Sequence, residues 1–474
     1  MPFDNETGEP RLYWLSEGAA VALTDDLDAL GAEAISREDR LLAFDGLRLP
    51  PVAALSHATV IRVGQVVGAM QVVIGAFELR GDDELVVRAR AIRLDTGRLF
   101  PEVVETGPLA DVFDVFARVA RRLLPDSRVP LEQMEEAHPP LPAFEAYIKG
   151  VLAETPATQV TFLNQAVRLA PGFQRARLAL WEVHTAEGEH RRALDIVGEV
   201  PAGHRSARRA RFLAGLSRIN LREYQQATEA LQALNGEQPD PAILTALGVA
   251  QLRRPAGVAT GLRAVTFFED AARLDPSDPD LHFNLGYAAY LDRDMDDAIA
   301  SLREAVRRNP ADDAAHYVLG VALQATGANA EGAREKELAR RLSSTYAEWE
   351  AQQGGVNAAP RGLERMKIRL DAAGTPRVED ALVATGQRDQ RELAAFHLES
   401  GRRLFEAGRD ADAIGELRRA IYLAPYDSTA HLLLGRAYLR GGRTAEAIDA
   451  LKIAVWADPN NREAQDLLAT IPVP

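Results

Sequence analysis

The stretch Pro279–Pro310, PDLHFNLGYAAYLDRDMDDAIASLREAVRRNP, decides the fold. Small and apolar residues recur at helical spacing in both of its halves: Leu285, Gly286, Ala289, Ala298, Leu302 and Ala305. A glycine lets two helices approach closely, the larger apolar side chains fill the space between them, and a proline ends a helix. The stretch therefore predicts two paired helices, the second of which ends at Pro310.

The same residue types recur 34 positions apart elsewhere in the chain. The pairs that show this period are Gly286 and Gly320, Gly401 and Gly435, Pro276 and Pro310, and Pro425 and Pro459. A 34-residue period with two helical halves is that of the tetratricopeptide repeat (TPR), and the sequence resembles that family at these positions. The resemblance implies a mainly α fold, a TPR-like right-handed α-solenoid of about eight helix pairs plus a capping helix.

The repeats fall into two groups because the phase is lost between Gly320 and Gly401, which are 81 residues apart. We expect an array of six units over 143–350, in which Trp181 takes the glycine position of the second unit. An irregular helical linker over 351–391 contains short helical patterns near Leu363–Ala372 and Val378–Ala384. Two further units and a capping helix occupy 392–474, and their orientation across 351–391 is left open.

Residues 1–128 lack the repeat and predict a small α/β domain, followed by a linker over 129–142. Helical periodicity covers Trp14–Leu30, Leu55–Gly68 with Ser56 as its cap, and Val112–Leu124. The expected strands are Ala32–Ser36, Gln71–Phe77 and Leu85–Leu94. The order of elements predicts a helix-covered sheet.

This region resembles the TolB N-terminal-like or FlgO-like domain that precedes TPR arrays in bacterial proteins. The residues that carry the resemblance are Val67–Ala69, Val72–Ala76, Val86–Arg90, Leu94–Gly97 and Gly107–Leu109. In that family a buried strand precedes a Pro-Phe-x-Asn turn, whereas here Pro2-Phe3-Asp4-Asn5 follows Met1 directly. Two interpretations stay open: a shortened edge in a cytoplasmic protein, or a native start further upstream with a signal peptide and a periplasmic or cell-envelope location.

Composition excludes several classes of function. The chain has 26% charged residues, a formal net charge of −14 and no cysteine. The acidity argues against a nucleic-acid binder, and the absence of cysteine excludes disulfides and thiolate chemistry. No apolar run is long enough to span a bilayer, so no membrane insertion is expected.

No pattern typical of an enzyme or a cofactor site is found. Phosphate-loop, zinc-protease and nucleophile-elbow motifs do not occur, so we expect no catalytic residue, no cofactor and no metal. The four histidines His282, His316, His397 and His431 share one position of the repeat, which favours packing over metal binding. Asp292, Asp294 and Asp296 resemble the start of a calcium loop, but Arg303 stands where the glutamate ligand is needed.

The remaining candidate site is the concave surface of the solenoid. The resemblance places these residues at ligand-facing positions of first helices: Phe212, Phe283, Tyr287, Tyr290, Tyr317, Arg402 and Arg436. Packing between repeats is the competing explanation for the aromatic ones. We expect a non-catalytic scaffold or adaptor that binds a protein or peptide there. The alternative is a sensory or regulatory module that partners a kinase, cyclase or transcriptional regulator. Alanine at Phe283, Tyr287 and Tyr317 should weaken partner capture and preserve helical content.

Overall fold

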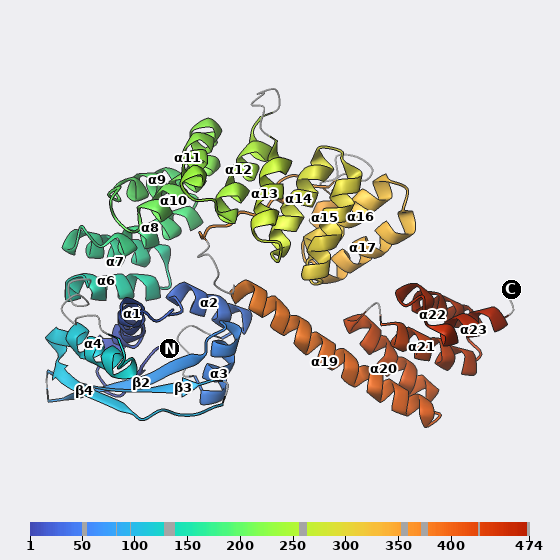
Figure 1. The fold of residues 1–474 in the computed structure, drawn as a ribbon, viewed down its shortest axis with the longest axis horizontal. Coiled ribbons are helices and arrows are strands. Elements are labelled where there is room, and N and C mark those ends of the chain that lie inside the picture. Colours follow the sequence, from blue (N-terminus) through green and yellow to red (C-terminus); the bar gives the residue numbers. More distant parts are fainter. Residues whose placement is uncertain are drawn as a thin grey trace. The chain divides into compact units, whose positions relative to one another are not determined.

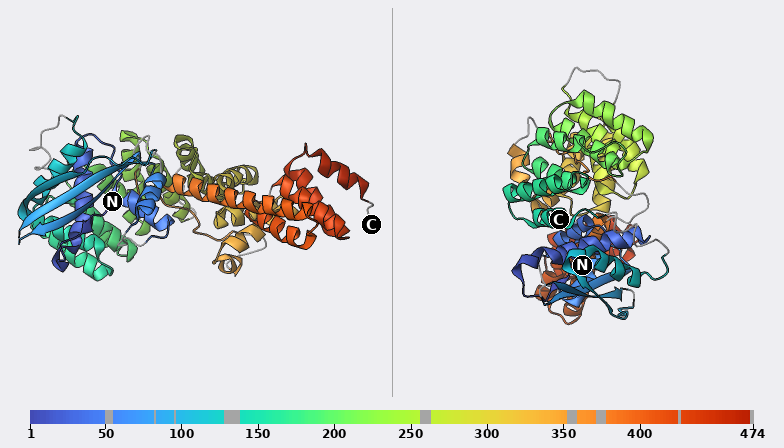
Figure 2. Two further views of the ribbon diagram at one scale, coloured as in Figure 1. Left: turned by 90° about the horizontal axis from the view of Figure 1, so that it is seen from below. Right: turned by 90° about the vertical axis from the view of Figure 1, so that its left-hand side faces the viewer.

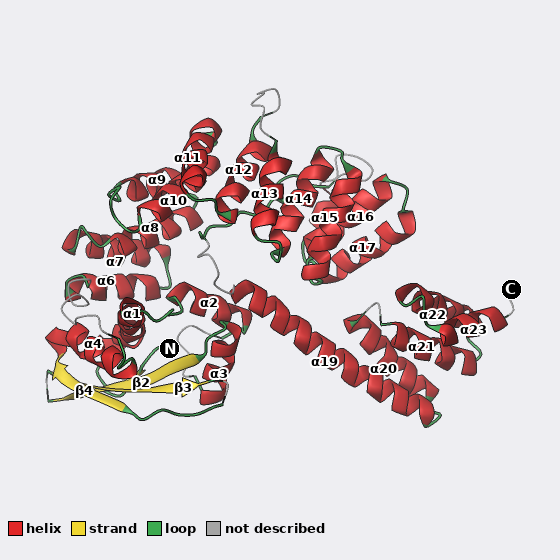
Figure 3. Ribbon diagram, viewed as in Figure 1, coloured by secondary structure: helices red, strands yellow, loops and turns green. Residues whose placement is uncertain are grey.

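The computed structural model describes residues 1–49, 55–81, 83–94, 96–127, 138–255, 263–351, 359–370, 378–424 and 427–471. The chain forms two compact units, Met1–Arg377 and Val378–Pro474. Parts of the sequence-based expectations lie outside the described residues, namely 129–137, 352–358 and 371–377 of the linkers and Pro425. The mainly helical fold with a small sheet at its N-terminal end is confirmed (Figures 1 and 3).

The first unit begins with a four-stranded sheet in the order β1-β2-β3-β4. The strands are β1 (Asp4–Asn5), β2 (Gln71–Arg80), β3 (Glu84–Arg93) and β4 (Val103–Pro108). The helices of this region are α1 (Tyr13–Ala29), α2 (Arg37–Gly46), α3 (His57–Val66) and α4 (Val112–Leu123), with short 3-10 turns at Pro10–Leu12 and Leu109–Asp111. Helix α4 lies against β3 and β4, and Figure 2 shows this blue to cyan region from two further sides. Ser56 caps α3 as predicted, since its hydroxyl accepts from the Thr59 amide at 3.2 Å.

Three details of this region differ from the sequence-based expectation. The strand expected over Ala32–Ser36 is wrong, because those residues form the approach to α2, which Ser36 caps. The strand β4 has no counterpart in the expectation. Asp4 and Asn5 pair in parallel with Ala76 and Phe77 on β2, so a short first strand exists after all. A Cβ on Gly75 of β2 would collide with the Phe3 ring, which explains the glycine there.

Six helix pairs follow one another in the first unit, and each pair packs on the next. Their bounds are α6 (Leu141–Leu152), α7 (Pro156–Leu169), α8 (Gln174–Ala186), α9 (His190–Gly198), α10 (Ala207–Asn220), α11 (Tyr224–Glu237), α12 (Pro241–Arg253), α13 (Ala264–Leu274), α14 (Pro279–Leu291), α15 (Met295–Arg308), α16 (Asp313–Ala325) and α17 (Asn329–Leu342). The short helix α18 (Tyr346–Ala351) comes after them. The described residues thus form six helix pairs in this part of the array.

The second unit contains two more pairs and a final short helix. It consists of α19 (Val378–Glu406), α20 (Asp410–Leu423), α21 (Ser428–Arg440), α22 (Thr444–Ala457) and α23 (Arg462–Thr470). The buried face of α23 contributes Ala464 to a small cluster with Leu432, Leu451 and Ala454 of the last pair. Helix α23 therefore covers the end of the array as the expected capping helix.

A glycine and a leucine lock the two helices of most pairs together. A Cβ on Gly286 of α14 would lie 2.7 Å from Cγ of Leu302 on α15, which is too close for any side chain. The same contact joins Gly215 to Leu231 and Gly435 to Leu451. The glycine is therefore needed for close packing at these positions.

Histidines also recur at one position of the repeats. His316 Nδ1 lies 2.6 Å from Glu335 Oε2, and His397 Nδ1 lies 2.7 Å from Glu416 Oε2. Each glutamate is 19 residues beyond its histidine, on the second helix of the same pair. Of the four histidines at this repeat position, His316 and His431 are buried, and His282 and His397 are half-buried.

The α/β region and the first helix pairs share one hydrophobic core. Trp14 of α1 and Phe113 of α4 both make edge contacts with Phe144 of α6, with ring centroids 6.3 and 5.1 Å apart. Arg175 of α8 forms a bidentate ion pair with Asp25 of α1, and both nitrogen–oxygen distances are 2.7 Å. The sheet region thus covers the apolar end of the solenoid, which would otherwise face water.

Candidate functional site

The site lies on the surface formed by the first helices α12, α14 and α16, which we call the first-helix face. Residues 359–370 of the same chain, which we call the internal segment, lie along this face in non-helical conformation. Figure 1 shows the segment as an orange trace that passes beside α12, α13 and α14. The first-helix face of this unit is therefore occupied by an extended stretch of its own chain.

Side chains of α14 hold the backbone of the internal segment. Asn284 donates from Nδ2 to the Arg365 carbonyl and accepts the Arg365 amide on Oδ1, both at 2.8 Å. Tyr287 donates its hydroxyl to the Pro360 carbonyl at 2.7 Å, and Tyr290 accepts the Ala359 amide at 3.0 Å. Both Asn284 and Tyr287 are fully buried. These groups recognise peptide backbone, so the α14 surface is suited to an extended chain.

The Arg365 side chain is held by carboxylates from two repeats. Its guanidinium makes a bidentate pair with Asp312, at 2.6 and 2.7 Å, and contacts Asp280 of α14. The guanidinium carbon also lies 3.9 Å from the centroid of the Phe283 ring, within the range of a cation–π contact. A planar guanidinium matches this set of contacts and an ammonium does not.

Further charges and apolar contacts extend along the segment. Lys367 pairs with Asp278, and Glu364 accepts from Arg253 of α12 at 2.7 Å. Arg369 pairs with Asp39 of α2 at 2.7 Å. Met366 and Leu370 pack against the core of the middle repeats, and Leu363 packs against the core of α14–α16. The contacts therefore run from the sheet region to α16.

Charge complementarity is strong at this surface. The internal segment has four basic residues (Arg361, Arg365, Lys367 and Arg369) and one acidic residue (Glu364), which gives +3 in a chain of −14. Burial opposes the charge of Arg365, but hydrogen bonds and the charges of Asp312 and Asp280 outweigh it and raise its pKa. Burial and the charge of Glu364 raise the pKa of Tyr287 to about 12, so its hydroxyl remains a donor at neutral pH.

The sequence-predicted aromatic residues take different places. Phe283, Tyr287 and Tyr290 contact the internal segment, as described above. The ring of Tyr317 on α16 is covered by α18 instead, and its hydroxyl donates to Glu350 at 3.0 Å. Phe212 of α10 lies in the core of the middle repeats, where it is fully buried. The structure thus brings three of these five residues together.

The predicted arginines lie in the second unit, on the last two pairs. Arg402 is half-buried and pairs with Glu399 of its own helix at 3.5 Å. Arg436 pairs with Glu463 of α23 at 2.8 Å and lies 5.2 Å from the Phe405 ring. Both arginines have partners within their own unit.

The sequence analysis missed the residues that make the most specific contacts. Asn284, Asp278 and Asp312 were not singled out, although Asp278 and Asp312 are 34 residues apart. Each of these aspartates caps the first helix of its repeat, since its side chain accepts from a backbone amide of that helix. The repeated helix cap could have been recognised in the sequence. The additional pairing of these aspartates with Arg365 and Lys367 of the internal segment could not.

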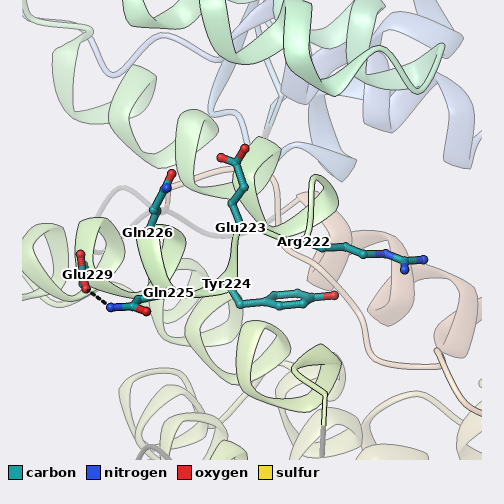
Figure 4. A pocket seen from close by; sticks show the side chains of 6 residues that line it. All are labelled: Arg222, Glu223, Tyr224, Gln225, Gln226 and Glu229. Atoms are coloured by element: carbon teal, nitrogen blue, oxygen red, sulfur yellow. Dashed lines mark hydrogen bonds between the residues drawn. The ribbon is translucent and has the colours of Figure 1, made fainter. Parts of the chain in front are cut away.

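The rest of the described surface has a polar hollow and no cluster of metal ligands. The polar hollow, of about 430 Å³, lies at the α10–α11 turn, but its side chains point in different directions (Figure 4). It is lined by Arg222, Glu223, Tyr224, Gln225, Gln226 and Glu229. Within the described part of the chain, no three acidic or histidine side chains gather as metal ligands would. The described residues also include no helix that is both long and apolar enough to cross a membrane.

Sequence models of one family match the helix pairs on both sides of the internal segment. The tetratricopeptide repeat matches residues 262–312 and 292–345, and again residues 404–471. These parts of the chain are tetratricopeptide repeats. TPR proteins are in general scaffolds for protein interactions. No curated protein matches the sequence, and the resemblance of the sheet region to TolB-like domains stays a prediction.

Solved TPR structures share the helical fold at low identity. PilF of Pseudomonas aeruginosa is 19% identical, with a TM-score of 0.34 over 42% of this chain and 90% of that one. YrrB, a TPR protein with an unusual peptide-binding site, is 17% identical, with a TM-score of 0.31 over 40% and 97%. MamA from Desulfovibrio magneticus RS-1 is 18% identical, with a TM-score of 0.31 over 38% and 97%. Likeness at this level says nothing about what this chain binds.

Proposed function

We propose that the protein is a non-catalytic interaction scaffold that binds an extended segment of a partner protein on its first-helix face. The observation that carries this proposal is the Asn284 side chain, which bonds both the amide and the carbonyl of one peptide residue. Together with the Asp280 and Asp312 carboxylates, it forms a surface that recognises a peptide by backbone and by charge. The site residues proposed are therefore Phe283, Tyr287 and Tyr290 with these polar neighbours.

Affinity capture with a charge-neutral variant tests the scaffold function. The double variant Asp280→Asn/Asp312→Asn removes the two carboxylates, and asparagine at 312 keeps a helix cap. The matched control is Asp296→Asn/Asp297→Asn, which removes two exposed charges from the first turn of α15. We expect proteins captured by wild type and the control to be lost from the first variant. An identical set of captured proteins for all three would contradict the proposal.

A regulatory module is the second candidate function. The observation in its favour is the Arg369–Asp39 pair, which joins the internal segment to α2 of the sheet region at 2.7 Å. Ser36, which caps α2, also bonds Asp39 at 2.7 Å. A ligand that moved α2 would thus alter a contact of the segment that lies on the first-helix face.

A further inference from the structure

We propose that the internal segment is a built-in competitor, and that the partner of the first-helix face carries the same pattern: an arginine, then a lysine two positions later, in an extended apolar stretch. This inference rests on the proposed function, because it names the chemistry of the ligand of that site. It assigns the surface a specificity for basic rather than acidic peptides.

The basic side chains of the segment fit acidic side chains of the surface. Arg365 and Lys367 point to carboxylates that belong to the surface, namely Asp280, Asp312 and Asp278. With the segment in place, Asp278 and Asp312 are buried to 95% or more as residues, and buried carboxylates require paired cations. The segment supplies cations to Asp278, Asp280 and Asp312, so the surface favours a basic occupant.

The internal segment is held by side chains of the repeat, as a bound peptide ligand would be. Its backbone makes no ladder with neighbouring strands, and its described hydrogen bonds to α14 come from side chains of the repeat. The side chains of Arg361 and Ile368 are exposed, and Gly362 adopts a positive φ of 86°. A free peptide of the same sequence could make the same contacts without any change in the repeats.

The internal segment and a free peptide compete for the first-helix face. A segment on the same chain acts at an effective concentration in the millimolar range. If the segment itself binds with an intrinsic dissociation constant of about 10 μM, it weakens the apparent affinity for a free peptide by about 100-fold. A partner therefore binds well only when it outcompetes the segment or when the segment is released.

The experiment uses the full-length chain and a fluorescein-labelled synthetic peptide with the sequence of residues 359–370. Arg365→Ala weakens the internal segment but leaves the surface carboxylates intact. Arg361→Ala removes an exposed arginine from the same segment and is the matched control. In the Arg365→Ala background, Asp312→Asn removes one carboxylate and keeps the helix cap. Circular dichroism and size-exclusion chromatography with light scattering check the fold and the oligomeric state of each variant.

We expect monomeric Arg365→Ala to bind the peptide at least tenfold more tightly than wild type and Arg361→Ala do. Adding Asp312→Asn should reverse that gain. If wild type and Arg365→Ala bind the peptide with equal, measurable affinity, the internal segment is not a competitor, and the proposed function stays intact. Absence of binding by every variant, including Arg365→Ala, would overturn the proposed function as well. Dimers that exchange the segment between two copies would also overturn a competitor acting within one chain.

Discussion

Asn284→Ala is the most informative single substitution. The side chain is fully buried and makes two hydrogen bonds of 2.8 Å, one to the amide and one to the carbonyl of Arg365. Alanine removes both bonds and leaves two peptide groups of the internal segment without partners. Each such loss costs about 1–2 kcal/mol in a buried site, so the attached state is weakened by about 2–4 kcal/mol.

Unlike a residue of the hydrophobic core, the internal segment can detach from the first-helix face while the helices stay folded. The detached population should therefore rise by about 30- to 1000-fold, since 1.4 kcal/mol corresponds to a factor of ten. Hydrogen exchange followed by mass spectrometry reports this directly for a peptide covering 359–370. Global stability in urea should fall by less than the local loss, because unfolding then starts from the detached form.

Asn329→Ala, at an exposed position early in α17, is the control and should leave exchange in 359–370 unchanged. If Asn284→Ala is folded and the segment exchanges as slowly as in wild type, the two hydrogen bonds do not hold it. That result would refute both the role of Asn284 in holding the internal segment and the loss of about 2–4 kcal/mol.

Two further predictions concern the repeats. Gly286→Ala should lower the free energy of unfolding in urea by about 1–3 kcal/mol, because its Cβ would lie 2.7 Å from Cγ of Leu302. The control Gly236→Ala, whose Cβ has nothing within 4 Å, should raise that free energy by about 0.5–1 kcal/mol. Equal effects of the two substitutions would contradict the close-packing role of Gly286. Burial alone would lower the pKa of His316, but Glu335 outweighs it and raises that pKa above 6.5, so this pair stabilises the fold fully below pH 6.5 and less as the pH rises through the raised value. His316→Gln should therefore lower Tm more at pH 6 than at pH 9, and a larger loss at pH 9 would disprove the assignment.

The repeat architecture was predictable because its constraints are local and recur. A glycine such as Gly286 must face the following helix, and a proline such as Pro310 must end one, whatever the rest of the chain does. The eight pairs follow from these positions. The α2 helix was missed since residues 37–46 show only a weak apolar pattern, with all of the first four positions charged.

The internal segment could not be predicted in the same way. Leu363, Met366 and Leu370 have the spacing of one helix face, in keeping with the helical pattern expected near Leu363–Ala372. Residues 363–370 are not helical, so that expectation was wrong for them, and residues 371 and 372 lie outside the described part of the chain. The extended form is preferred because Asn284 satisfies its backbone, and Asn284 is about 80 residues away in sequence. Local periodicity contains no information about such a distant partner.

The burial of the predicted binding residues was also not predictable from local periodicity. Phe283, Tyr287 and Tyr317 have the right helix positions, but all three are fully buried. Replacing them together with alanine would create cavities that cost about 3–5 kcal/mol for each aromatic side chain. Helical content would then not be preserved as the sequence suggested, and the carboxylate variants are the sharper probes of binding.

The common core of the sheet region and the first helix pairs makes the two ends of this array unequal. Repeat arrays can gain or lose whole units during evolution because each unit contacts only its neighbours. Here the unit that carries Phe144 is tied to Trp14 and Phe113 outside the array, so its duplication would bury one copy against the wrong surface. Variation in array length should therefore accumulate beyond α9, while the junction at α6 is inherited as one block.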